Sequence, residues 1–136
     1  MRVQAALLAR FAETDPDSGL LNLMGGGLDV IGLNHLPAQF PVSFAVVLRF
    51  PEEEAGHEVQ LKLVIRGPGL ETVGEPATFQ ITPGLGGHHA PGWEGTFTVT
   101  GALRLVVEST GTHSISVQID GTEAGVIPFQ VLLARG

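Results

Sequence analysis

Apolar residues recur at every second position along most of this chain. The run at residues 3–11 alternates in this way, and the runs at 42–50 and 59–65 repeat the pattern. Such alternation is typical of strands with one buried face, because successive side chains of a strand point to opposite sides of a sheet. Shorter runs occur near residues 20–24, 79–81, 97–99, 103–107, 115–119 and 127–133, with a turn expected at Thr100-Gly101 between the runs at 97–99 and 103–107. We therefore expect eight or nine strands.

Residues typical of turns separate these runs. The chain holds 19 Gly and 9 Pro, and Asp120-Gly121 between two alternating runs favours a two-residue hairpin. Asp15 and Asp17 flank Pro16 and are expected to be turn residues. Residues 51–55 are compatible with one helical turn, but a charged loop is favoured. Many short strands with frequent turns predict an all-β fold, an antiparallel β-sandwich, formed by a single domain over residues 1–136.

The alternation also predicts which side chains form the core. In each run, the larger apolar residues share one parity, which means that they occupy either the odd-numbered or the even-numbered positions and point to the same face of the strand. The predicted core residues are Val3, Leu7, Phe44, Val46, Leu48, Leu61, Leu63, Phe97, Leu105, Ile115, Val117, Phe129 and Val131. His57 and His113 share the apolar parity of their runs, so we expect both rings to be partly buried and structural.

The opposite faces of several runs are not polar either. The apolar residues on the side expected to face solvent include Ala6, Leu8, Leu21, Leu23, Ala45, Val47, Val106 and Leu132. Charged residues make up 15% of the chain, against roughly 25% in typical soluble domains. A strand that is apolar on both faces is central in its fold or covered by a partner. We therefore expect a homo-oligomer or a complex with another protein.

The charge balance excludes several classes of partner. Seven basic residues oppose 14 acidic ones, which gives a net charge of −7. Nucleic acids and anionic membranes attract basic surfaces, so we expect neither as a partner. The absence of cysteine removes disulfides and thiolate chemistry and fits a reducing compartment. No apolar run has the length of a secretory leader or a membrane span, and we expect a cytoplasmic protein.

One long segment breaks the regular spacing of the strands. Residues 82–93 form a loop rich in Gly and Pro that contains His88, His89 and Trp93. Long loops frequently carry binding residues. These three residues are the candidate site for a small ligand or a carbohydrate. Trp93, however, shares the parity of Phe97, and a core position at the start of a strand is favoured for it.

Other candidate chemistry has less support in the spacing. The glycines at 25–27 match neither phosphate-binding fingerprint, and a strand irregularity is favoured. The five histidines lack metal-ligand spacing, and adjacent His88 and His89 point apart on an extended backbone. None of the five serines lies in a nucleophile elbow, and no pair of carboxylates stands out. We therefore expect no catalytic residues, no metal, no cofactor and no enzymatic activity.

Several short motifs, taken in order, resemble those of a known family. They are residues 5–10 (Ala-Ala-Leu-Leu-Ala-Arg), 20–31 with the three glycines, 36–39 (Leu-Pro-Ala-Gln), 111–113 (Gly-Thr-His), Asp120-Gly121 and 127–131 (Ile-Pro-Phe-Gln-Val). The chain resembles a family of small bacterial proteins with a domain of unknown function, in which an aromatic residue is common at the position of His113. The resemblance implies a single-domain, immunoglobulin-like β-sandwich and implies no activity.

Two functions follow as alternatives. The favoured one is a non-enzymatic structural or protein-interaction module that self-associates, because of the apolar second faces and the low charge. The other is a small-ligand or carbohydrate-binding module that uses the 82–93 loop. A fold of this kind is compatible with either function, so the two can be distinguished only by the residues of the functional site.

Overall fold

The computed structural model describes residues 1–86 and 89–133. Within these residues there are ten strands and one short 3₁₀ turn, η1 (Glu52–Glu54). The strands are β1 (Arg2–Ala9), β2 (Phe11–Thr14), β3 (Leu21–Met24), β4 (Val30–Leu33), β5 (Ala38–Phe50), β6 (Val59–Arg66), β7 (Ala77–Ile81), β8 (Gly95–Val107), β9 (Gly111–Ile119) and β10 (Thr122–Leu133). The all-β expectation is confirmed. The strand count differs from the expected one because the first run divides into β1 and β2, and because β4 was not expected. The expectation of a turn at Thr100-Gly101 is wrong, since both residues lie inside the continuous strand β8, where Gly101 pairs with Phe44.

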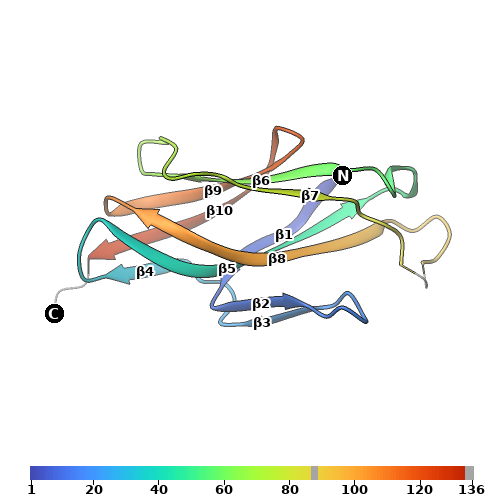
Figure 1. The fold of residues 1–136 in the computed structure, drawn as a ribbon, viewed down its shortest axis with the longest axis horizontal. Helices are drawn as coiled ribbons and strands as arrows, with labels where there is room; N and C mark the ends of the chain where they lie inside the picture. Colours follow the sequence, from blue (N-terminus) through green and yellow to red (C-terminus); the bar gives the residue numbers. More distant parts are fainter. Residues whose placement is uncertain (87–88, 134–136) are drawn as a thin grey trace.

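The strands form three sheets (Figure 1). One sheet has the order β1-β5-β8, a second has the order β4-β10-β9-β6-β7, and β2 pairs with β3 in a separate hairpin. The pairs are antiparallel except that β10 and β4 run parallel, so the expectation of a wholly antiparallel fold is wrong at this edge. β4 and β10 are distant in sequence, and no hairpin imposes an antiparallel direction on them. In the described part of the chain, no helix has the length and apolar character needed to cross a membrane.

A single core lies between the three-stranded and five-stranded sheets (Figure 1). The predicted core residues that are buried are Phe44, Val46, Leu48, Leu61, Leu63, Leu105, Ile115, Val117, Phe129 and Val131. Val3 and Phe97 are half-buried and pack against this core. The parity of the strands therefore predicted most of the core correctly.

The prediction for Leu7 is wrong because β1 contains a β-bulge. The pairing of β1 with β5 shifts between Val3 and Ala5, which reverses the parity of the residues that follow. Leu8 now lies opposite the core residue Phe44 and is fully buried. Directly opposite residues share a face of the sheet, so Leu7 faces outward instead. Ala6 and Leu8 thus belong to the inner face, not to the outer apolar face expected from the sequence.

The β2–β3 hairpin forms a third layer over the outer face of the three-stranded sheet (Figure 1). Ala45 lies on that outer face and is only 1% exposed. Thr14 of β2 and Thr100 of β8 are hydrogen-bonded, with 3.2 Å between their Oγ1 atoms. The chain itself therefore covers part of the surface that the sequence assigned to a partner.

Two turns show how local sequence sets the backbone. Asp120 and Gly121 have φ angles of 48° and 84°, and they form the predicted two-residue hairpin turn between β9 and β10. Positive φ at both central residues is the requirement that Asp-Gly satisfies. Residues 52–54 form the 3₁₀ turn η1 after Pro51, so the preference for a charged loop is wrong.

The two histidines expected to be partly buried have different environments. His113 is buried; its Nδ1 lies 3.1 Å from the Gly111 carbonyl oxygen, and its ring stacks on Phe129. The structural interpretation of His113 is therefore confirmed. His57 is exposed because β6 begins only at Val59, so the parity of that strand does not apply to it.

Candidate functional site

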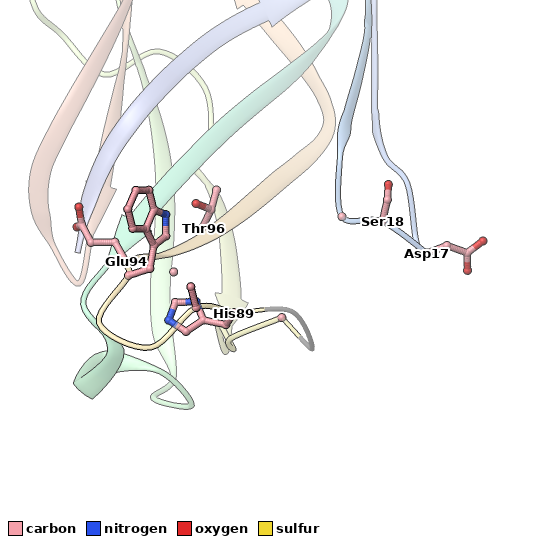
Figure 2. Close-up of a pocket in the computed structure, with 10 residues that line it drawn as sticks. Asp17, Ser18, His89, Glu94 and Thr96 are labelled. Atoms are coloured by element: carbon pink, nitrogen blue, oxygen red, sulfur yellow. The ribbon is translucent and has the colours of Figure 1, made fainter.

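The 82–93 loop faces the tip of the β2–β3 hairpin across an open cleft of about 960 Å³ (Figure 2). The lining consists of Asp17, Ser18 and Gly19 from the hairpin tip, Gly86, His89, Ala90 and Trp93 from the loop, Glu94 after it, and Gly95 and Thr96 from β8. Two parts of the chain that are distant in sequence, the hairpin tip and the loop with the start of β8, therefore build one site, and two of the three residues proposed from the sequence line it. His88 lies outside the described residues.

Trp93 is 65% exposed, so the prediction that it belongs to the core is wrong. β8 begins at Gly95, and the fully buried ring of Phe50 packs directly against Gly95. A side chain at Gly95 would overlap the Phe50 ring. Phe50 therefore fills the end of the core that parity assigned to Trp93, and the indole is left in solvent at the cleft.

A hydrogen-bonded clasp ties the loop to η1. Oε1 of Glu52 accepts a hydrogen bond from Nε2 of His89 at 3.0 Å, and it accepts a second from the backbone N–H of Gly92. These bonds, first that of His89 and then that of Gly92, lower the pKa of Glu52, because donors favour the charged carboxylate. The clasp of Glu52, His89 and Gly92 fixes the loop immediately before Trp93.

A second attachment lies immediately after Trp93. Both carboxylate oxygens of Glu94 accept hydrogen bonds from the Arg2 guanidinium, with 2.9 Å between Nη2 and Oε1. The hydrogen bonds and the charge of Arg2 lower the pKa of Glu94, and Glu94 in turn raises the pKa of Arg2. Glu94 is thus held charged, and Trp93 lies between two attached neighbours.

The sequence did not single out the hydroxyl groups of the cleft. Ser18 lies at the hairpin tip, and the exposed Thr96 lies at the start of β8. Only the packing of the hairpin over β8 brings these residues to one cleft, so no local pattern signals them. Asp17 acts as the predicted turn residue, since its N–H donates to Oδ1 of Asp15 at 2.9 Å. Figure 2 shows the Asp17 side chain pointing away from the loop.

The other candidates from the sequence lie away from the cleft. The N–H of Arg10 donates to the carbonyl of Gly25, and the N–H of Gly27 donates to the carbonyl of Leu8. The glycines at 25–27 therefore serve backbone pairing at the end of β1, as the structural interpretation predicted. Within residues 1–86 and 89–133, no three His, Asp or Glu side chains gather closely enough to hold a metal ion.

Comparison with protein-family models matches residues 4–132, which is nearly the whole chain, to one family. The chain belongs to the family of unknown function DUF6941. Membership in DUF6941 agrees with the resemblance to an uncharacterised domain family, and the bacterial origin stays a prediction. No curated protein matches the chain, and no solved structure matches it. The function of this DUF6941 domain therefore has to be argued from its cleft and its surface.

Proposed function

We propose that this DUF6941 domain is a non-enzymatic binding module whose cleft holds a carbohydrate against Trp93. The observation that carries the proposal is the 65% exposure of the indole in an open cleft. An aromatic side chain in water gains free energy when a ligand covers its apolar face. A sugar ring has an apolar C–H face and a polar rim, which suits an aromatic platform with hydroxyl groups beside it.

The groups around Trp93 match that rim. Thr96 supplies a hydroxyl to the cleft, and a hydroxyl both donates and accepts hydrogen bonds, as sugar hydroxyls do. Ser18 lines the opposite wall, where its Oγ accepts a hydrogen bond from the N–H of Leu20. The clasp at His89 and the Arg2–Glu94 pair hold the loop on both sides of Trp93. A platform that is already positioned loses less conformational entropy when it binds a ligand.

The carboxylates near the cleft support binding over acid–base catalysis. Hydrogen bonds lower the pKa values of Asp15, Glu52 and Glu94. A general acid at neutral pH needs a raised pKa, as in glycoside hydrolysis. The carboxylates of Glu52 and Glu94 are also already bonded to His89 and Arg2.

Intrinsic fluorescence tests this proposal directly. Trp93 is the only tryptophan and the chain has no tyrosine, so the emission reports on the cleft. Titration with oligosaccharides of glucose, mannose, galactose and N-acetylglucosamine should give a saturable blue shift for at least one sugar. By calorimetry, Trp93→Ala should abolish that binding, whereas Leu70→Ala, at a site 74% exposed in a different loop, should keep it. The proposal fails if no sugar produces a saturable change.

Self-association is a second candidate function, and apolar residues on the outer surface favour it. Val126 and Leu132 on the outer face of β10 are 50% and 53% exposed, and Val30 of the adjacent β4 is 48% exposed. Phe11 and Met24 lie opposite each other in the β2–β3 hairpin and are 46% and 68% exposed. Light scattering over a concentration series tests this candidate, and a monomer at every concentration would contradict it.

We also propose an immunoglobulin-like arrangement for the two main sheets. The order β1-β5-β8 corresponds to strands A-B-E of that fold, and β10-β9-β6-β7 corresponds to G-F-C-C′. The β2–β3 hairpin and β4 are then additions between the first two strands of the sandwich. An experimental structure would test this assignment through the same strand orders.

Our proposals on location and excluded partners rest on the charge balance. A net charge of −7 supports a protein that binds neither nucleic acid nor anionic membrane. The absence of cysteine supports a cytoplasmic location. Fractionation of the native host, followed by immunoblotting, would test both.

A further inference from the structure

β8 has a long uncovered edge. The strand spans Gly95–Val107 and pairs along its whole length with β5, but no strand in the described residues pairs with its other edge (Figure 1). The opposite edge of this sheet, β1, lies against the other sheet, where Val3 meets Gly125. The edge strands of the five-stranded sheet, β4 and β7, are short, with four and five residues. The edge of β8 is therefore the longest strand edge open to pairing.

The usual devices that block edge pairing are missing from residues 95–103 of β8. Natural sheets blunt their edges with charges, prolines or bulges. The stretch at 95–103 carries no charged residue and no proline, and the pairing with β5 runs over 13 residues without a shift in register. In immunoglobulin sheets of order A-B-E-D, a fourth strand covers this same edge. Over residues 95–103 the edge of β8 is thus regular, uncharged and without a partner strand in the part of the chain that the structure describes.

The sequence of β8 is complementary to itself in one antiparallel register. With a two-fold axis at Val99, Thr98 lies across from Thr100 of the second copy, and Arg104 lies across from Glu94 of the second copy. Cross-strand Thr–Thr pairs and opposite charges both stabilise antiparallel strands. Glu94 already accepts hydrogen bonds from Arg2, but a carboxylate has acceptor sites for a second guanidinium.

We infer that a second copy of this chain pairs with the uncovered edge of β8, in an antiparallel register centred on Val99. The pairing joins two three-stranded sheets into one six-stranded sheet across a two-fold axis. The pairing gives hydrogen-bond partners to the backbone N–H and C=O groups along both edges. It also places Arg104 across from Glu94 at each end of the contact. Elsewhere on the molecule, the net charge of −7 opposes association of two copies. This inference rests on the self-association candidate and names its surface.

The test compares two matched variants by light scattering and analytical ultracentrifugation. The wild-type chain should reach twice its monomer mass of 14.2 kDa as concentration rises. Thr98→Lys brings two ammonium groups within about 8 Å across the axis, and it should weaken the dimer by about tenfold or more. Thr78→Lys makes the same substitution at an exposed position of β7 and should leave the dimer unchanged. Circular dichroism establishes that each variant is folded.

A charge exchange tests the register independently. Arg104→Glu places a carboxylate across from Glu94 and should weaken the dimer, and adding Glu94→Arg should restore it. If the wild-type chain forms a dimer and neither Thr98→Lys nor Arg104→Glu weakens it, this inference is wrong. The chain would then self-associate through another surface. A wild-type monomer at all concentrations would overturn both. Loss of the dimer in Thr98→Lys without rescue in the double variant would reject the register centred on Val99.

Discussion

Two aromatic side chains at one end of the molecule have opposite environments. Phe50 pairs with Gly95 at the end of β5 and is fully buried, whereas Trp93, just before Gly95, is 65% exposed. The register of β5 with β8 places the Phe50 ring. The hydrogen bonds of Glu52 and Arg2 to the residues around Trp93 place the loop that carries the second. The difference indicates that the sheets supply stability at this end, while the loop is available for recognition.

The largest expected effect separates the two rings by their contribution to stability. Phe50→Ala should lower the free energy of unfolding by about 3–5 kcal/mol, because it leaves a cavity in the core. Trp93→Ala should change it by less than about 0.5 kcal/mol, as surface substitutions do. Denaturant unfolding followed by circular dichroism measures both. Equal losses in the two variants would contradict the comparison.

A smaller effect is expected at the glycine between the two rings. The methyl group of Gly95→Ala would overlap the Phe50 ring, and such overpacking costs roughly 1–3 kcal/mol of unfolding free energy. Gly84→Ala is the matched control, since a methyl group there meets no atom within 4 Å. If Gly95→Ala were as stable as Gly84→Ala, Phe50 would not occupy the space that excludes Trp93 from the core.

The hydrogen bonds of the clasp should weaken at low pH. Because the pKa of Glu52 in the folded chain lies below its ordinary 4.5, the clasp stabilises the loop at higher pH and is lost as the pH falls through the lowered value. The emission of Trp93 should therefore change in that acidic range. Glu52→Gln should reduce this transition to the part that comes from the Arg2–Glu94 pair, whereas Glu53→Gln, a substitution of the neighbour in η1, should keep it whole. A transition of undiminished size in Glu52→Gln would show that the clasp does not position Trp93.

The smallest effect is expected for the pair on the other side of Trp93. Arg2 and Glu94 are partly in solvent, and exposed ion pairs contribute little to stability. Arg2→Ala should leave the thermal midpoint unchanged within error, and should shift the emission of Trp93 less than Glu52→Gln does. A large loss of thermal stability in Arg2→Ala would show that this pair holds the fold and not only the loop.

The sequence predicted the regular part of the molecule because strand parity and turn residues are local signals. Phe44, Leu61 and Ile115 follow parity, and Asp120-Gly121 forms the expected turn. Leu7 does not follow parity, because a bulge in β1 depends on its partner strand. Trp93 was assigned to the core because nothing in the sequence shows that Phe50 packs against Gly95.

The candidate site was predictable only in part, for the same reason. The composition of the 82–93 loop pointed to His89 and Trp93, and both line the cleft. The other wall comes from Ser18 in a hairpin that folds over β8, which is a tertiary contact without a local signal. Glu52 was counted only as part of a charged run, although it ties the loop in place.

The central claim is that a carbohydrate binds against Trp93, and one NMR experiment tests it most directly. The single indole N–H of the chain gives one resonance in a proton–nitrogen correlation spectrum. We expect that resonance, with the amides of Ser18 and Thr96, to shift saturably with a bound sugar while the core amides of β9 stay in place. An indole resonance that is unmoved by every sugar, or shifts of equal size across the sheets, would contradict the account.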